Sequence, residues 1–228
     1  MIKTVPVTDA DKRSAELFFN QLTSYFDTAS WDVLDMFART GDLTVVNYKD
    51  KVANVDCWEL EAEHYDALAA RGVRDIKIGC SYATALNCED RYDMVVVDSP
   101  QGLHNDFDQV LRVEHFSAMF EAANLLKDSG ILVLYVNKKP YNKDEIGTHG
   151  YDEYEEYDFN TWMMKREFFY MVGDGKNVTE ADAIDAYTTH LAANGFKVDQ
   201  VFMTPCYSDV EGLEPYAFRL GLKVTRTR

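Results

Sequence analysis

The stretch Asp32-Val33-Leu34-Asp35-Met36-Phe37-Ala38-Arg39-Thr40-Gly41-Asp42-Leu43 decides the fold. It predicts a short buried strand over residues 32–36, a tight loop closed by Gly41, and a short helix from residue 41 toward residue 46. A loop that joins a strand to a helix lets backbone N–H groups face a polar or anionic ligand. The stretch therefore predicts a ligand-binding loop at the end of a strand.

Strand-like and helix-like segments alternate along the rest of the chain, which indicates right-handed crossovers and a parallel sheet. The further expected strands are 52–58, 77–78, 92–97, 131–136, 197–204 and 216–225. The further expected helices are 9–28, 62–70, 114–127, one near 162–171, and one that opens on the capping box of residues 179–182 and ends at residues 194–195. Ser129-Gly130 is expected to be the stop between helix 114–127 and strand 131–136. The last two strands follow each other through a short link, which suggests one antiparallel strand inserted at the sheet edge. Residues 1–228 are expected to form a single domain, with a leading helix in residues 1–30 and an insertion over residues 138–178.

Composition and charge narrow the class of protein. The chain has 228 residues, and 39 acidic against 23 basic side chains give a net charge of −16. A broad nucleic-acid surface is not expected, because such surfaces are usually basic. The apolar runs are only as long as strands, so no membrane span is expected. The start of the chain has no apolar signal-peptide core, and the four cysteines have no metal-ligand spacing, which points to a cytoplasmic protein with reduced thiols.

The segment from Leu34 to Gly41 resembles the first motif of the class I S-adenosylmethionine-dependent methyltransferases. The likeness is best to the Phe-Ala-Gly-Thr-Gly form found in RNA and DNA methyltransferases, and Arg39 stands where that form has glycine. The resemblance extends from about residue 31 to the C-terminus, apart from the insertion. It implies a Rossmann-like α/β fold whose seven-stranded, mostly parallel sheet has an antiparallel last strand and helices on both faces. It also implies that the cofactor S-adenosyl-L-methionine binds at Asp35, Phe37, Ala38, Arg39, Thr40 and Gly41.

The second matching motif is Trp58-Glu59-Leu60-Glu61-Ala62-Glu63. The family places an acidic residue at the end of strand two, where its carboxylate accepts the ribose hydroxyls of the cofactor. The resemblance gives this role to Glu59, with Leu60 beside it. Asp56 is a competitor, but the spacing from Gly41 favours Glu59. The alternative is that Glu59 is a solvated carboxylate stabilised by the dipole of the following helix.

A third motif, Ile78-Gly79-Cys80-Ser81-Tyr82, resembles the Gly-Asp-Ala segment that follows strand three in the family. There the aspartate accepts a hydrogen bond from the adenine amino group. The thiol of Cys80 is a weak acceptor, so Ser81, backbone groups or packing are expected to take over this contact.

The fourth motif, Val97-Asp98-Ser99-Pro100-Gln101-Gly102, resembles the segment where substrate and methyl donor meet. The resemblance implies that Asp98, Ser99 and Pro100 lie at the cofactor. Asp98 is the first candidate to orient or deprotonate the acceptor, because the carboxyl ends of central strands face the ligand crevice. His104 and His115 are further catalytic candidates, with surface or capping roles as the alternative. Gln101 stands where amino-directed nucleic-acid enzymes have an aromatic residue.

The acidic, tyrosine-rich segment 151–158 of the insertion has three interpretations: a lid, a hard-cation site, or an exposed loop. No metal site is expected, since calcium-loop spacing is absent. The helix expected just beyond it packs on the domain or on a second subunit, so a homodimer stays open.

Three functions remain. The first is a methyltransferase that acts on an unidentified nucleic acid or small molecule. The second is a non-catalytic protein of the same fold. The third is a nicotinamide-dependent oxidoreductase, which fits poorly because the Gly-x-Gly-x-x-Gly fingerprint is absent.

Overall fold

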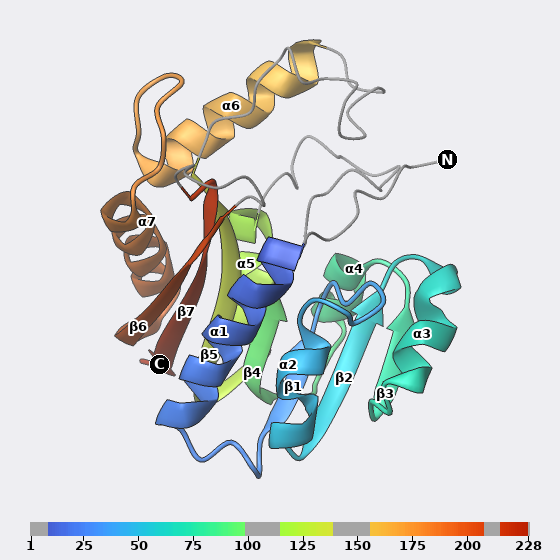
Figure 1. Ribbon diagram of the computed structural model, residues 1–228. Helices are drawn as coiled ribbons and strands as arrows, with labels where there is room; N and C mark the ends of the chain where they lie inside the picture. The colour runs from blue at the N-terminus through green and yellow to red at the C-terminus, as the bar shows by residue number, and fades with distance from the viewer. Residues whose placement is uncertain (1–8, 99–114, 139–155, 208–214, 228) are drawn as a thin grey trace.

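The computed structural model describes residues 9–98, 115–138, 156–207 and 215–227 (Figure 1). Its seven strands form one sheet in the order β3-β2-β1-β4-β5-β7-β6. The strands are β1 (Asp32–Asp35), β2 (Asn54–Glu59), β3 (Asp75–Ile78), β4 (Tyr92–Val97), β5 (Leu126–Asn137), β6 (Phe196–Cys206) and β7 (Ala217–Arg226). β7 runs antiparallel to β5 and β6, while the other paired strands are parallel. The expected seven-stranded fold is confirmed, but β7 lies between β5 and β6 instead of at the sheet edge.

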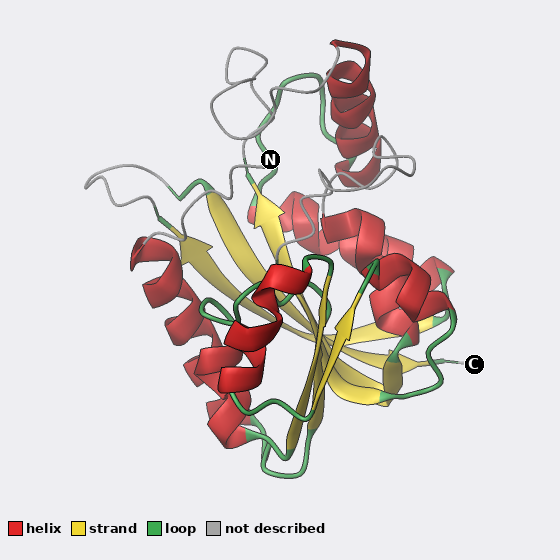
Figure 2. Ribbon diagram, turned by 90° about the vertical axis from the view of Figure 1, so that its right-hand side faces the viewer, coloured by secondary structure: helices red, strands yellow, loops and turns green. Residues whose placement is uncertain are grey.

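Helices cover both faces of this sheet (Figure 2). One face packs against α1 (Asp9–Tyr25), α2 (Val45–Tyr48) and α3 (Tyr65–Ala70), and the other against α4 (Ser81–Leu86), α5 (Met119–Asn124) and α7 (Glu180–Ala193). Among the described residues, three short 3-10 helices, η1 (Lys49–Lys51), η2 (Ala62–His64) and η4 (His115–Ala118), adjoin α2, α3 and α5. α6 (Glu156–Tyr170) lies beyond the end of the sheet, beside α7 (Figure 1).

β4 shows the burial that its apolar sequence predicts. Met94 and Val96 belong to the apolar core on one face of the sheet, and Val95 and Val97 belong to the core on the other face. All four side chains are fully buried, as expected for a central parallel strand. The capping box that opens α7 is also present, with the Thr179 hydroxyl accepting from the Asp182 N–H at 3.2 Å. Among the described residues, none of the helices combines the length and the apolar character needed to cross a membrane.

The start of β5 differs from the expectation. The helix was expected to reach residue 127 and to stop at Ser129-Gly130, but α5 ends at Asn124 and β5 begins at Leu126. The pairing of β4 with β5 shifts register between Tyr92 and Met94, which brings the chain at Gly130 close to β4. A Cβ on Gly130 would lie 2.9 Å from the carbonyl oxygen of Asp93. Gly130 therefore allows a close strand contact, where the sequence suggested a stop.

We expect Gly130→Ala to lower the free energy of unfolding by about 1–3 kcal/mol, because the added methyl overlaps a backbone atom that cannot move alone. The neighbouring Ser129→Ala is the control, since Ser129 is exposed. Urea denaturation of both variants checks this, and equal stabilities would contradict the close contact.

Candidate functional site

The site is built where β1, β2 and β4 end side by side. Asp35, the last residue of β1, pairs in register with Cys57 of β2 and Val96 of β4. Glu59 and Asp98 follow these partners by two residues, so the three carboxylates lie together at the carboxyl ends of the parallel strands. The loop after β1 stays tied to both neighbours, as Met36 donates its N–H to Val96 (3.0 Å) and Ala38 donates to Trp58 (3.1 Å).

The loop after β1 turns through two residues with left-handed backbone. Arg39 has φ of 49° and Gly41 has φ of 68°. A side chain in this conformation costs roughly 1–2 kcal/mol, which glycine avoids. Gly41 is also needed for packing, because a Cβ there would lie 3.2 Å from both Leu68 and Val45. Thr40 completes the turn by donating its hydroxyl to Asp42 at 2.6 Å.

Glu59 connects this loop to the end of β2. Its carboxylate accepts the backbone N–H of Arg39 at 2.6 Å on one oxygen and that of Glu61 at 3.0 Å on the other. The residue is 6% exposed. Each carboxylate oxygen can accept more than one hydrogen bond, so acceptor capacity remains for a ligand hydroxyl. Half-buried Leu60 follows directly.

Asp56, the competitor of Glu59, lies three residues before it in β2. Its carboxylate accepts Nε of Arg74 at 2.8 Å and the hydroxyl of Tyr92 at 3.0 Å. These bonds make Asp56 part of an ion pair away from the loop after β1.

Asp35 lies beneath the loop with no exposed surface. Its carboxylate accepts the hydroxyls of Thr44 and Tyr48, the latter at 2.9 Å, and the N–H of Phe37 at 3.4 Å. Burial raises the pKa of Asp35 to about 6, against the lowering effect of these hydrogen bonds. The Asp35 carboxylate thus joins both ends of the loop.

The segment after β3 brings small groups to the site. Gly79 donates its N–H to the backbone oxygen of Glu59 at 2.8 Å. Apart from its two chain neighbours, no atom of the described residues lies within 4 Å of where its Cβ would stand. Cys80 is half-buried and precedes α4, a helix that the sequence did not predict. Ser81 is buried and donates its hydroxyl to the backbone oxygen of Met36 at 2.5 Å, so its proton is used to hold the loop after β1.

Asp98, just beyond β4, is paired with an arginine from β7. Its carboxylate accepts Nη2 of Arg219 at 3.2 Å, and Nε of Arg219 lies 3.2 Å from its other oxygen. Arg219 is fully buried and donates Nη1 to Ser14 of α1 at 3.0 Å. Burial raises the pKa of Asp98, while the positive charge of Arg219 opposes the increase. Asp98 is therefore an interior ion-pair partner as well as a strand-end carboxylate.

Four of the expected catalytic and cofactor residues have side chains that the structure does not describe. Ser99, Pro100 and His104 lie outside the described residues, as does the segment 151–155. His115 begins η4, and its side chain is not among those described.

Sequence reasoning missed three partners of the site: Tyr48, Thr44 and Arg219. For Arg219 a signal existed, because one arginine stands between Phe218 and Leu220 in an otherwise apolar strand segment. A lone cation at such a position is often paired inside the protein. Nothing in the local pattern marks Thr44 or Tyr48 as partners of Asp35.

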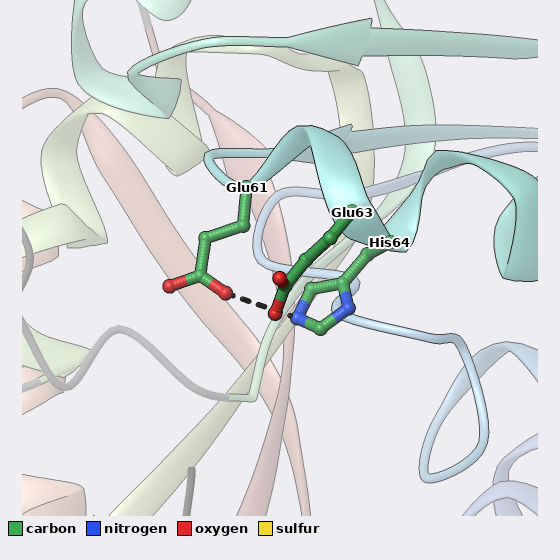
Figure 3. A group of neighbouring side chains, drawn as sticks. All are labelled: Glu61, Glu63 and His64. Carbon is green, nitrogen blue, oxygen red and sulfur yellow. Dashed lines mark ion pairs between the residues drawn. The ribbon is translucent and has the colours of Figure 1, made fainter. Parts of the chain in front are cut away.

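One group of side chains near the site is close enough to share a cation. Glu61, Glu63 and His64 on and before η2 have potential ligand atoms within 4.8 Å of one another (Figure 3). Nε2 of His64 already lies 3.3 Å from the Glu61 carboxylate, and Glu63 is exposed. This pairing accounts for the arrangement, and we assign no metal to it.

Comparison with known proteins identifies the fold. No family model and no curated protein sequence matches the chain. Solved structures do match over nearly the whole chain. M. jannaschii TYW2 in complex with AdoMet has a TM-score of 0.54 at 13% identity, covering 97% of this chain and 78% of that one. The suggested RNA methyltransferase PH1948 of Pyrococcus horikoshii has a TM-score of 0.54 at 14% identity, covering 100% of this chain and 93% of that one. The N-methyltransferase NodS of Bradyrhizobium japonicum WM9 has a TM-score of 0.54 at 9% identity, covering 96% of this chain and 98% of that one.

At these identities the likeness shows the fold alone. The chain has the fold of the class I S-adenosylmethionine-dependent methyltransferases, as the motifs predicted.

We expect the native protein to lose free energy of unfolding, compared with the Asp35→Asn variant, as the pH rises from about 4 to 6. The folded-state pKa of Asp35, about 6, exceeds the ordinary 3.8, so the folded protein binds more protons in this interval. Stability is then lost at up to about 1.4 kcal/mol per pH unit. Urea denaturation at several pH values measures the difference. Tyr48→Phe removes a donor to the carboxylate and should extend the decline to higher pH; a difference independent of pH would refute the assignment.

We expect Asp98→Ala to destabilise the protein by about 3–5 kcal/mol, because it leaves the buried guanidinium of Arg219 without its carboxylate. The double variant Asp98→Ala with Arg219→Met removes both charges and should lose less. Denaturation curves of the two decide the point: a single variant as stable as the native protein would show that the pair contributes nothing.

Proposed function

We propose that the protein binds S-adenosyl-L-methionine and transfers its methyl group to an acceptor, either a nucleic acid or a small molecule. The observation that carries this proposal is the position of Glu59. Its carboxylate ends β2 and is bonded to the N–H of Arg39 in the loop after β1. In this proposal the acid binds the ribose beside a glycine-containing turn, in the fold that the comparisons show.

The described residues fit the cofactor. The Glu59 oxygens retain acceptor capacity for two ribose hydroxyls after binding the Arg39 and Glu61 N–H groups. Gly79 leaves open space beside Glu59 where a side chain would otherwise project. Half-buried Leu60 and Cys80 flank the same edge and offer packing surface for the adenine. Thr40 and Arg39 would face the methionine end.

The bound cofactor supplies an activated methyl group on its sulfonium, so the protein mainly has to position the reactants and exclude water. In this proposal the loop after β1 holds one end of the cofactor and Glu59 holds the ribose. Asp98 is placed to orient the acceptor, and its pairing with Arg219 fixes its direction. Proton removal by Asp98, His104 or His115 stays a prediction, as does a cytoplasmic location.

Two other functions compete with this proposal. A non-catalytic protein of the same fold is favoured by the departures at Arg39 and Cys80 from the family pattern. A nicotinamide-dependent enzyme would require a glycine-rich loop that this chain lacks.

A thermal-shift titration separates the three functions, because a ligand that binds only the folded state raises the melting temperature. Stabilisation by S-adenosylhomocysteine and not by NAD supports the proposal, while no shift with either favours a non-catalytic protein. A screen with labelled cofactor against DNA, RNA, protein and small molecules then tests turnover.

We expect Glu59→Gln to weaken S-adenosylhomocysteine binding by about tenfold, since two charge-assisted hydrogen bonds to the ribose lose strength. Glutamine retains one acceptor oxygen for the loop and limits damage to the fold. Calorimetry measures the affinity, and Asp56→Asn serves as a control, because Asp56 lies in the same strand but is paired with Arg74. Unchanged affinity in Glu59→Gln, or an equal loss in both variants, would contradict the site.

A further inference from the structure

Arg39 occupies a position that is unfavourable for any residue but glycine. Its φ of 49° places it in the left-handed region, where the resembling motif has glycine. Neighbouring contacts hold the backbone there. Its N–H is bonded to Glu59 at 2.6 Å, and the Gly41 N–H is bonded to Ala38 at 2.8 Å. Strain of this kind persists where the surroundings impose it, and it is frequent at ligand sites.

The guanidinium of Arg39 has no partner among the residues that the structure describes. Its backbone N–H bonds to Glu59, but within the described ranges its side chain makes no hydrogen bond, ion pair or ring contact. The protein has 39 acidic side chains, so a shortage of carboxylates does not explain why the Arg39 guanidinium has no described partner. The other arginine beside the loop, Arg71, donates Nε to the Thr40 carbonyl at 3.2 Å and supports the loop backbone. The half-buried Arg39 guanidinium is thus available to pair with an anionic ligand.

We propose that Arg39 binds the carboxylate of the methionine end of the cofactor and makes recognition depend on that carboxylate. This inference rests on the proposed function, in which the loop after β1 holds the methionine end. It adds a specific anion-binding residue where the resembling motif has only backbone.

The overall charge explains why a cation is useful there. A net charge of −16 disfavours an anionic group at the surface. The Glu59 carboxylate, which accepts the backbone N–H of Arg39, adds local negative charge. A guanidinium can pair with a carboxylate through two parallel hydrogen bonds, which offsets this repulsion and selects the planar group.

Four variants and two ligands test the proposal by calorimetry. S-adenosylmethionine is compared with decarboxylated S-adenosylmethionine, which keeps the adenosine, sulfonium and amino groups and lacks only the carboxylate. Arg39→Gln removes the charge, Arg39→Lys keeps it, and Arg39→Gly restores the residue of the resembling motif. Arg91→Gln is the matched control, because Arg91 is an exposed arginine directly before β4, at the opposite end of the strands from the site.

We expect Arg39→Gln to weaken S-adenosylmethionine binding by about tenfold and to change binding of the decarboxylated ligand by less than about twofold. Arg39→Lys should retain part of the preference, and Arg91→Gln should alter neither affinity. Arg39→Gly should raise the melting temperature, because it relieves the left-handed backbone, and should still weaken S-adenosylmethionine binding. A residue with a purely structural role would not separate stability from affinity in this way.

The opposite results overturn the proposal. Unchanged S-adenosylmethionine affinity in Arg39→Gln shows that the guanidinium does not bind the carboxylate. Equal loss of both ligands shows damage to the loop. Tighter binding in Arg39→Gly shows that Arg39 fills the space of the carboxylate. In these three cases the native protein still binds the cofactor and the proposed function stands, whereas failure of the native protein to bind S-adenosylmethionine overturns both.

Discussion

The hydrogen bond from the Arg39 N–H to the Glu59 carboxylate fixes the geometry on which the site depends. It joins the turn after β1 to the last residue of β2 at 2.6 Å. The parallel pairing of the two strands already brings their ends to one edge, but strand pairing alone does not position a loop. With this bond in place, the left-handed turn at Arg39 and the acid of β2 face the same space. The strain at Arg39 is tolerated because a buried carboxylate holds its backbone.

Two further carboxylates stabilise the strand ends by different means. Asp35 is surrounded by the neutral donors Thr44 and Tyr48, so burial dominates and its pKa rises to about 6. Asp98 is paired with the buried Arg219, which connects the ends of β4 and β7 and, through Ser14, reaches α1. The edge of the sheet is thus held by one hydroxyl network and one ion pair, and Glu59 is the carboxylate that binds the loop itself.

Much of the fold could be predicted, since apolar runs and turn residues report local structure. β4 and the capped start of α7 match the expectation because both depend on neighbours in the sequence. The Ser129-Gly130 stop was wrong, as a glycine that allows a close strand contact looks the same in sequence as one that ends a helix. The partner of Asp98 was not predictable in the same way, because Arg219 lies 121 residues away.

The sequence by itself determined the order of the seven strands, the glycine-closed loop after β1 and the acid that follows it, because each depends on a few consecutive residues. Only the tertiary structure decided that β7 lies between β5 and β6, that Asp35 is enclosed by Thr44 and Tyr48, and that Asp98 is neutralised by Arg219. These contacts depend on how the segments pack when both faces of the sheet are buried. The same packing leaves the Arg39 guanidinium without a partner among the described residues, although the sequence is rich in acids.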